Sequence, residues 1–325
     1  MDPIRLGIIG SGGMASRRAE KFAAHKDTVV TYIAAQNTQT GPELAKRIGA
    51  ECLTDWEALL ATDVEAVFIG THNELHGPIT ISALEAGKHV FAEYPTSRHP
   101  EEGRRIAELI GSTSSPVLRA TNNESISAEH AALKDQVRIL GSLLTSHFVR
   151  LTPGRGKRPE VLFNLQLTGP PALFFVYHIH TYVSLFGPAQ WVHCAAEYEG
   201  QREDTGYDRF ANTLTVGFAS GGTGQWTWAG GIEIEKTVQE ARISMNDGTL
   251  IETQTGWDIS RNAGTTALEF GENNRTLEDL FVADVRGETD WRSDARMALD
   301  AAAIGHAAEI SAKERRVFEL RELGL

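Results

Sequence analysis

IRLGIIGSGGMA, residues 4–15, is the stretch of sequence that decides the fold. Residues 4–9 form a short apolar run, which predicts a buried parallel strand. The residues that follow have the form G-x-G-x-x-A: Gly10, Ser11, Gly12, Gly13, Met14 and Ala15. In this pattern the first glycine permits a tight turn, the second lets a pyrophosphate approach the backbone, and the alanine allows close packing of helix on strand. The stretch therefore predicts a dinucleotide-binding turn.

The alternation of strand and helix continues beyond this turn as far as Asn122. β-rich runs separated by helical segments occur at residues 28–35, 66–70, 89–92 and 117–120. Strands spaced by helices in this way predict βαβ units and a parallel sheet. We therefore expect a Rossmann domain over residues 1–122.

The pattern changes after residue 122. A helix is predicted over residues 128–140, and β-type stretches follow at residues 144–151, 191–198, 212–219, 223–229 and 241–245. Strands without intervening helices favour a mostly antiparallel sheet. The predicted fold class is thus α/β, with a C-terminal α+β domain for substrate and oligomerisation over residues 123–325.

Composition excludes several classes of protein. The chain has 31 Lys and Arg against 43 Asp and Glu, a formal net charge of −12, and nucleic-acid binding needs a concentrated basic surface instead. No run approaches the roughly 18 apolar residues of a membrane helix, and the first residues do not resemble a signal peptide. Cys52 and Cys194 lie in different halves and predict neither a disulfide framework nor a metal cluster. We expect a cytoplasmic protein with a small-molecule substrate.

The end of the second predicted strand bears on the choice of coenzyme. A carboxylate there would bind the ribose 2′-hydroxyl of NAD, whereas this chain has Ala35, Gln36, Asn37 and Thr38. The absence of an acid removes repulsion from a 2′-phosphate, and the polar side chains can donate hydrogen bonds to it. This favours NADP(H) over NAD(H), although an ordinary polar loop would have the same composition.

Three further segments resemble the glucose–fructose oxidoreductase/inositol dehydrogenase (Gfo/Idh/MocA) family. They are the residues 70–76 (GTHNELH), the residues 83–90 (ALEAGKHV) and Glu93-Tyr94-Pro95, which stands where the family has E-K-P. The resemblance implies a cis peptide before Pro95. It also implies that the cofactor is contacted by Thr71, His72, Asn73, His76, Glu93 and Tyr94.

Within that family the chain is most similar to the biliverdin reductase branch, which also carries E-Y-P. Sugar-oxidising members use the lysine of E-K-P with an aspartate and a histidine. Alignment on Gly169 and Gly187 places Phe174 at the aspartate and His178 at the histidine, and biliverdin reductases have arginines near this point. Two of the three catalytic groups of a sugar dehydrogenase are therefore missing.

The candidate catalytic residues are Tyr94, His178 and His180. A histidine, with a reference pKa of about 6.5, can supply a proton at neutral pH, whereas a tyrosine, near about 10, is mainly an oriented hydrogen-bond donor. His178 is alternatively a histidine held within the aromatic residues around it. His178 and His180 lack a convincing third ligand, so we expect no metal site.

Several functions remain open. The first is NAD(P)H-dependent reduction of a small C=N or conjugated C=C substrate, as in a biliverdin-reductase-like enzyme. The second is a sugar or polyol dehydrogenase with His178 as base, and the third is a non-catalytic NAD(P)-binding regulatory protein. A fourth uses bound NAD within a lyase or glycosidase cycle.

Two expectations concern partners. The family associates through its C-terminal sheet, which implies a homodimer or homotetramer. Arg155, Lys157 and Arg158 lie in a loop rich in proline and glycine, where they would either meet an anionic substrate group or form an ordinary exposed basic loop.

Overall fold

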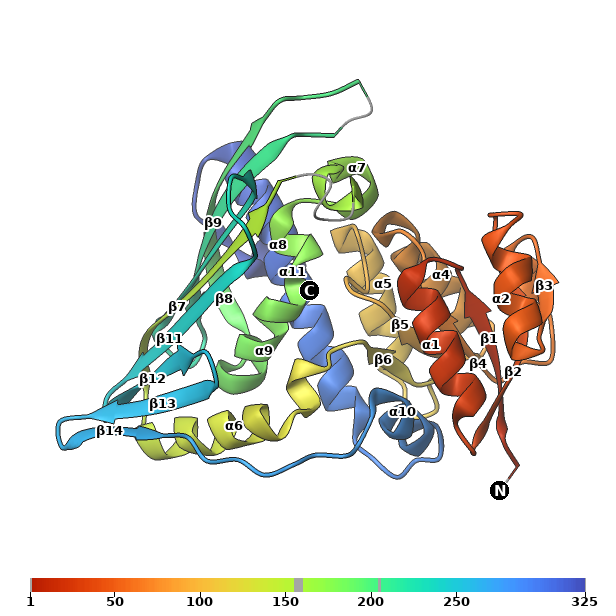
Figure 1. The fold of residues 1–325 in the computed structure, drawn as a ribbon, viewed down its shortest axis with the longest axis horizontal. Coiled ribbons are helices and arrows are strands. Elements are labelled where there is room, and N and C mark those ends of the chain that lie inside the picture. Colours follow the sequence, from red (N-terminus) through yellow and green to blue (C-terminus); the bar gives the residue numbers. More distant parts are fainter. Residues whose placement is uncertain (1, 155–159, 204–205, 325) are drawn as a thin grey trace. The chain divides into compact units, whose positions relative to one another are not determined.

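A computed structural model describes residues 2–154, 160–203 and 206–324 of the chain. They form two compact units, one of residues 1–122 with 275–299 and one of residues 123–274 with 300–325. Figure 1 labels the elements of both. The basic loop residues Arg155, Lys157 and Arg158 lie outside the described residues.

The first unit is built on a six-stranded sheet in the order β3-β2-β1-β4-β5-β6, with every pair parallel. Its strands are β1 (Ile4–Ile9), β2 (Thr28–Ala34), β3 (Glu51–Leu53), β4 (Ala66–Ile69), β5 (His89–Ala92) and β6 (Leu118–Ala120). Its helices are α1 (Gly13–Ala24), α2 (Thr40–Ile48), α3 (Trp56–Leu60), α4 (Asn73–Glu85), α5 (Pro100–Ile110) and α10 (Leu277–Val285). This is the predicted Rossmann domain.

The strand order reverses between β1 and β4. Because crossover connections are right-handed, helices before the reversal cover one face of the sheet and helices after it cover the other. The face covered by the helices before the reversal is therefore left open where it passes over β5, and another segment must pack there. Phe281 of α10 does so, with its ring centroid 5.3 Å from Phe91 and 6.1 Å from Phe22 of α1.

The prediction placed all of residues 123–325 in the second domain, and the structure differs for one segment. Residues 275–299 belong to the first unit. The physical reason is the apolar face described above, together with an ion pair of 2.6 Å between Arg18 Nη1 and Glu278 Oε1. The other boundary, after Asn122, is where the sequence pattern changes.

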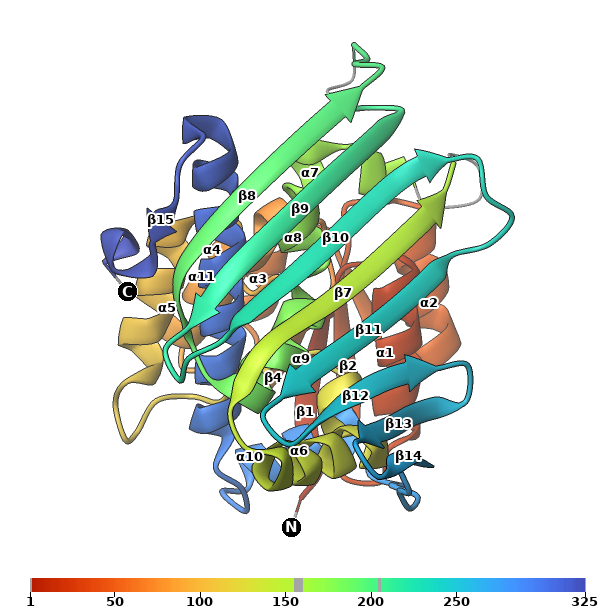
Figure 2. The same cartoon turned by 90° about the vertical axis from the view of Figure 1, so that its left-hand side faces the viewer.

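The second unit contains a nine-stranded sheet in the order β14-β13-β12-β11-β7-β10-β9-β8-β15. Its strands are β7 (Leu143–Pro153), β8 (Ala189–Glu199), β9 (Arg209–Phe218), β10 (Thr223–Ile232), β11 (Val238–Met245), β12 (Gly248–Thr253), β13 (Gly256–Arg261), β14 (Gly264–Ala267) and β15 (Phe318–Glu319). Only the β7–β10 pair is parallel among those described, so the mostly antiparallel sheet is confirmed. Figure 2 looks onto a face that is largely free of helices.

The residues between β7 and β8 fold into short helices that the sequence pattern did not predict. They are η2 (Glu160–Phe163), α7 (Leu165–Thr168), α8 (Pro171–Phe174) and α9 (Val176–Phe186). α9 buries residues around most of its circumference, from Val176 to Phe186, so it lacks the amphipathic period that reveals a helix.

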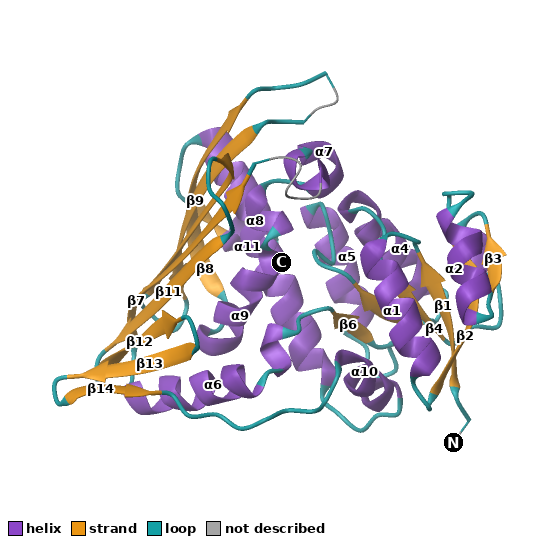
Figure 3. Ribbon diagram, viewed as in Figure 1, coloured by secondary structure: helices purple, strands orange, loops and turns teal. Residues whose placement is uncertain are grey.

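The remaining helical elements frame the same unit. They are η1 (Glu124–Ile126), α6 (Ala128–Leu140), α11 (Trp291–Glu314) and η3 (Leu320–Leu323), shown in purple in Figure 3. α11 begins among the residues of the first unit and continues into the second. The inward side chains of the central strands are large and fully buried, among them Trp226 and Trp228 of β10.

Candidate functional site

The glycine turn is held in shape by backbone contacts. Gly10 has a φ of +115°, which L side chains rarely adopt, and a Cβ built on it would lie 2.4 Å from the carbonyl oxygen of Gly70. A Cβ on Gly70 would in turn lie 3.2 Å from the Cβ of Ala15. The sequence G-x-G-x-x-A therefore meets two local needs, a special dihedral angle and close packing of α1.

The next two glycines face open space instead. A Cβ built on Gly12 or Gly13 would meet nothing within 4 Å, so packing within the described chain does not require glycine there. α1 begins at Gly13 with no side-chain cap and no acidic residue in its first turn. Unpaired N–H groups at a helix N-terminus attract a phosphate, so this turn fits the pyrophosphate of a dinucleotide.

Polar groups surround the turn. Ser11 Oγ lies 2.7 Å from Oγ1 of Thr40, the first residue of α2. Asn37 Oδ1 accepts hydrogen bonds of 3.0 and 2.9 Å from the backbone N–H groups of Gln39 and Thr40. Ala35 is half-buried, and Gln36, Asn37 and Thr38 are exposed. The oxygen of Asn37 thus organises the loop, while its amide N–H groups can meet a ligand.

His76 connects the loops that follow β4 and β5. It is 1% exposed, with Nδ1 2.9 Å from the carbonyl oxygen of Pro95 and Nε2 3.1 Å from that of Thr71. Burial lowers the pKa of the imidazole despite these two carbonyl groups. These contacts show His76 bracing the loops of Thr71 and Pro95, and its predicted contact with the cofactor stays a prediction. His72 is exposed, and Asn73 is buried at the start of α4.

The E-Y-P segment follows β5, and the peptide bond between Tyr94 and Pro95 is cis, as predicted. Glu93 Oε2 accepts a hydrogen bond of 2.5 Å from Thr121, and its Oε1 lies 3.9 Å from Nε of Arg18. Burial raises the pKa of this carboxyl group. The side chain of Glu93 is thus engaged with the protein, and its predicted contact with the cofactor stays a prediction. Tyr94 is 8% exposed.

His178 lies in the second unit, inside the aromatic cluster that its sequence neighbours suggested. Its ring centroid is 4.4 Å from Phe148 and 4.2 Å from Tyr177, and its Nδ1 accepts a hydrogen bond of 3.2 Å from Nε1 of Trp228. Burial, with a smaller effect of the Arg150 charge, holds its pKa well below 6.5. This favours the neutral imidazole in the folded chain, and the catalytic role of His178 stays a prediction.

The tautomer of His178 follows from its neighbour. An indole N–H can only donate, so Nδ1 must present its lone pair to Trp228. In a neutral imidazole the proton then resides on Nε2, which is left as a hydrogen-bond donor. His180, two residues further on, is fully buried and does not line the pocket described next.

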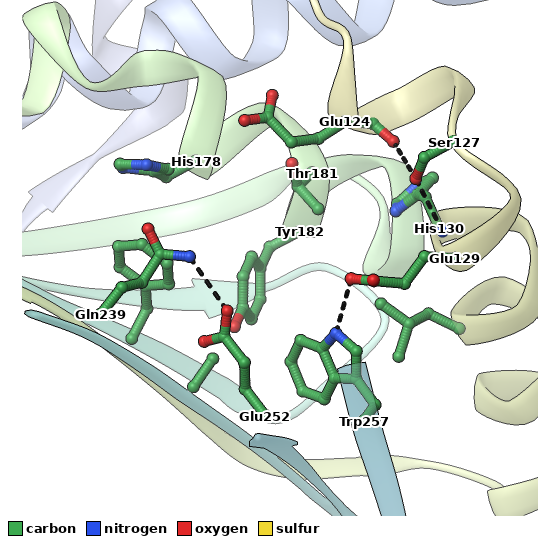
Figure 4. Close-up of a pocket in the computed structure, with 13 residues that line it drawn as sticks. Glu124, Ser127, Glu129, His130, His178, Thr181, Tyr182, Gln239, Glu252 and Trp257 are labelled. Atoms are coloured by element: carbon green, nitrogen blue, oxygen red, sulfur yellow. Dashed lines mark hydrogen bonds between the residues drawn. The ribbon is translucent and has the colours of Figure 1, made fainter. Parts of the chain in front are cut away.

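A pocket of about 110 Å³ opens beside His178 within the second unit (Figure 4). It is lined by side chains from η1, α6, α9 and four strands: Glu124, Ser127, Glu129, His130, Leu133, Phe148, His178, Thr181, Tyr182, Gln239, Ala241, Glu252 and Trp257. Sequence reasoning missed most of these residues. One signal existed for Glu252, since it shares the inward face of β12 with the fully buried Leu250.

Hydrogen bonds hold several of these groups in place. Gln239 Nε2 donates to Glu252 Oε1 at 3.0 Å, and Trp257 Nε1 donates to Glu129 Oε1 at 2.9 Å, both drawn in Figure 4. His130 Nε2 lies 2.9 Å from Ser184 Oγ, and burial lowers the pKa of His130 to about 4. Burial also raises the pKa of Glu252.

Across the described residues, no group of three His, Cys, Asp or Glu is placed to hold a metal ion.

The parallel sheet and the glycine turn define a Rossmann-type α/β protein. Residues 4–119 match the model of an oxidoreductase family with an NAD-binding Rossmann fold, the Gfo/Idh/MocA family. The family model thus confirms the resemblance seen in the motifs of this part of the chain.

Curated relatives match about a third of the chain. A levoglucosan dehydrogenase of Pseudarthrobacter phenanthrenivorans is 33% identical over 120 residues, 34% of this chain and 31% of the relative. A dTDP-3,4-didehydro-2,6-dideoxy-alpha-D-glucose 3-reductase of Actinomadura kijaniata is 38% identical over 109 residues, 33% of each chain. The chain thus matches about a third of the length of these relatives.

Solved structures extend the likeness of fold to the whole chain. Biliverdin reductase from Synechocystis, determined with biliverdin and NADP+, has a TM-score of 0.86 at 21% identity, covering 96% of this chain and 99% of the other.

Among the described residues, no helix is both long and apolar enough to cross a membrane.

Proposed function

We propose that the chain is an NAD(P)H-dependent reductase of a small substrate with a C=N or conjugated C=C bond. The observation that carries this proposal is the hydrogen bond from Trp228 Nε1 to His178 Nδ1. Because that bond leaves Nε2 as a donor, His178 can stabilise negative charge on a reacting atom but has no free lone pair to accept a proton. Reduction needs a donor that stabilises negative charge, whereas oxidation of an alcohol needs a lone pair that accepts the proton.

For a conjugated C=C substrate the His178 donor would stabilise the developing negative charge, whereas for an iminium substrate, where no negative charge develops, it would only orient the substrate. A bound reduced nicotinamide would supply the hydride for the new C–H bond at the carbon of an iminium ion, and the π electrons of the C=N bond would move to nitrogen. No proton is consumed in this step, because the iminium nitrogen already carries its substituents and becomes a neutral amine. The oxidised nicotinamide and the amine are the products.

Several residues of this chain are proposed to bind the cofactor. The turn Gly10-Ser11-Gly12-Gly13-Met14, at the N-terminus of α1, would hold the pyrophosphate. Gln36 and Asn37 would meet the adenosine ribose, where the lack of a carboxylate favours NADP(H). Thr71, His72 and Asn73 would line the nicotinamide ribose, and Tyr94 would orient the reacting groups as a hydrogen-bond donor.

A polyol dehydrogenase is the second candidate, favoured by the names of the curated relatives. It requires a base, and His178 fills that role only if its ring turns away from Trp228. A binding protein without turnover is the third candidate, since lysine and aspartate of the sugar dehydrogenases are replaced by Tyr94 and Phe174.

The test begins with titration of cofactor-free protein with NADPH and with NADH, followed by nicotinamide fluorescence. We expect tighter binding of NADPH, and then NADPH oxidation with cyclic imines but no NADP+ reduction with cyclic polyols. His178→Ala should lower turnover about 10²-fold with NADPH binding retained, because the donor that orients the substrate is lost. His193→Ala, an exposed histidine of β8, is the matched control and should leave turnover unchanged. Unchanged turnover in His178→Ala, or polyol oxidation alone, would contradict the proposal.

We also propose that the protein is a homodimer or homotetramer. Support comes from the large face of the nine-stranded sheet without helices in Figure 2. Two of the strands of this sheet also have exposed apolar residues, Leu144 of β7 and Val238 of β11. Light scattering should give a multiple of the 35.5 kDa chain mass, and a single species of that mass would refute the assembly.

A further inference from the structure

Three buried polar atoms of residues that line the pocket of the second unit lack a hydrogen-bond partner among the described residues: His130 Nδ1 and the two atoms on which the argument rests. One is the hydroxyl of Tyr182, a side chain that is 4% exposed. The other is Oε2 of Glu252, whose Oε1 is already bound by Gln239. A buried polar atom without a partner costs free energy, so such atoms point to a ligand that pairs with them.

The two atoms lie toward one another in Figure 4. The Glu252 charge contributes to raising the pKa of Tyr182, after the larger effect of burial, which shows that the two groups are close. No hydrogen bond joins them. One ligand atom placed between them can therefore contact both the carboxylate and the phenol.

The charge of the lining decides which ligand atom fits. Glu124, Glu129 and Glu252 all line the pocket, whereas the described part of its lining contains no lysine or arginine. The charge of Arg150, which acts on Glu124 and His178 and whose Nη1 donates to Gln239 Oε1 at 2.7 Å, offsets one of the three carboxylates. A cation in the pocket would offset the carboxylates, while an anion such as a propionate would be repelled.

Trp257 adds an aromatic surface to the same place. It is 8% exposed, and its hydrogen bond to Glu129 fixes the orientation of the indole. Aromatic rings next to carboxylates attract ammonium groups through their π faces. A neutral hydroxyl could also bridge Glu252 and Tyr182, but it would leave the charge of the lining uncompensated.

We propose that this pocket is a subsite for a positively charged nitrogen, with Glu252 as its counter-ion, Tyr182 as its hydrogen-bond partner and Trp257 as its aromatic wall. This inference deepens the proposed function, on which it rests, because reduction of an iminium ion starts from a cationic nitrogen and yields an amine. The substrate class is then a small cyclic or branched amine precursor rather than a polyol or a bilin.

The experiment compares two probes of the same shape and different charge. Cyclopentylamine, protonated at pH 7, and cyclopentanol are titrated into the full-length protein by calorimetry. We expect the amine to bind at least about 10-fold more tightly, which corresponds to about 1.4 kcal/mol. Glu252→Gln keeps the shape and removes the charge, so it should abolish the difference, and Tyr182→Phe should weaken amine binding several-fold.

Glu197→Gln is the matched control. Glu197 is an exposed carboxylate of β8 outside the pocket, so its loss changes net charge equally and should leave both probes unaffected. Equal binding of the two probes to the unaltered protein, or a preference for the amine that survives in Glu252→Gln, would overturn the inference. Should Glu252→Gln not fold, Tyr182→Phe decides alone, and unweakened amine binding overturns it.

The subsite and the proposed function fail in different ways. Amine binding that depends on Glu252, without NADPH oxidation by any imine, supports the subsite and contradicts the reductase. Imine reduction without Glu252-dependent amine binding supports the reductase and overturns the subsite.

Discussion

The charge cluster around Arg119 in the first unit is compensated, whereas the pocket of the second unit keeps polar atoms without a described hydrogen-bond partner. Arg119 is 5% exposed, and its guanidinium donates to both oxygens of Asp284 and, at 3.2 Å, to Asp294. Thr289 donates to the same Asp284. In the pocket, by contrast, the Tyr182 hydroxyl and one oxygen of Glu252 have no described partner.

Buried polar groups therefore have two different roles in this protein. A charge whose partners are all supplied by the chain holds distant segments together, here β6 with the segment that returns at residues 275–299. A polar atom left unpaired weakens the fold slightly and gains its partner when a ligand arrives. Substitutions in the compensated charge cluster should therefore lower the stability of the fold. Substitutions of the unpaired polar residues in the pocket should instead weaken ligand binding.

The largest expected effect is on the compensated cluster. Asp284→Asn keeps the shape but leaves Arg119 buried with less compensation, so unfolding in urea should show a loss of about 3 kcal/mol. Asp135→Asn, which removes a partner from an exposed pair with Arg138, is the control and should be nearly silent. A loss below about 1 kcal/mol for Asp284→Asn would break the comparison.

The next effect concerns His130, which lines the pocket and has a folded pKa of about 4 because of burial. Between pH 6.5 and 4 the unfolded chain binds a proton at this residue that the folded chain does not, so stability falls as pH decreases. The contribution is about 3 kcal/mol at most over this window. The free energy of unfolding of His130→Gln should fall less than that of the unaltered protein between these pH values. His147→Gln, at an exposed position, should show the same pH dependence as the unaltered protein. Parallel pH profiles for His130→Gln and the unaltered protein would count against the burial argument.

A third prediction sharpens the difference between the two glycines of the turn. Gly12→Ala adds a Cβ where the chain has open space, so the free energy of unfolding should change by less than about 1 kcal/mol. The same Cβ occupies the proposed pyrophosphate position, so NADPH binding should weaken at least about 10-fold. Gly271→Ala, also in open space, is the control for both measurements. Unchanged NADPH binding in Gly12→Ala would remove the turn from the cofactor site.

The smallest expected effect is on the stability contributed by Glu252. Its pKa is raised in the folded chain, chiefly by burial, so the carboxyl stabilises the fold below its ordinary pKa of about 4.5 and this contribution is lost as pH rises. Glu252→Gln should therefore melt about 1–2 °C higher than the unaltered protein at pH 7 and equally at pH 4. A lower melting temperature at pH 7 would mean that Glu252 holds the fold together rather than waiting for a ligand.

The parts that sequence reasoning found are those with local causes. The turn from Gly10 to Ala15 is specified by one dihedral angle and one close approach, both encoded within a few residues. Helix α9 escaped prediction because its aromatic and apolar residues show no single hydrophobic face. Its place in the fold depends on β7 and β10, whose Phe148 and Trp228 contact His178.

The sequence by itself determined the Rossmann sheet, the glycine turn and His178 as a residue of interest. Only the tertiary structure decided that His178 is neutral, that Glu93 and His76 brace the protein, and that Glu252 faces Tyr182. The physical reason is that strand periodicity and glycine geometry act over a few residues, whereas tautomers, desolvation and charge balance depend on side chains brought together from distant segments.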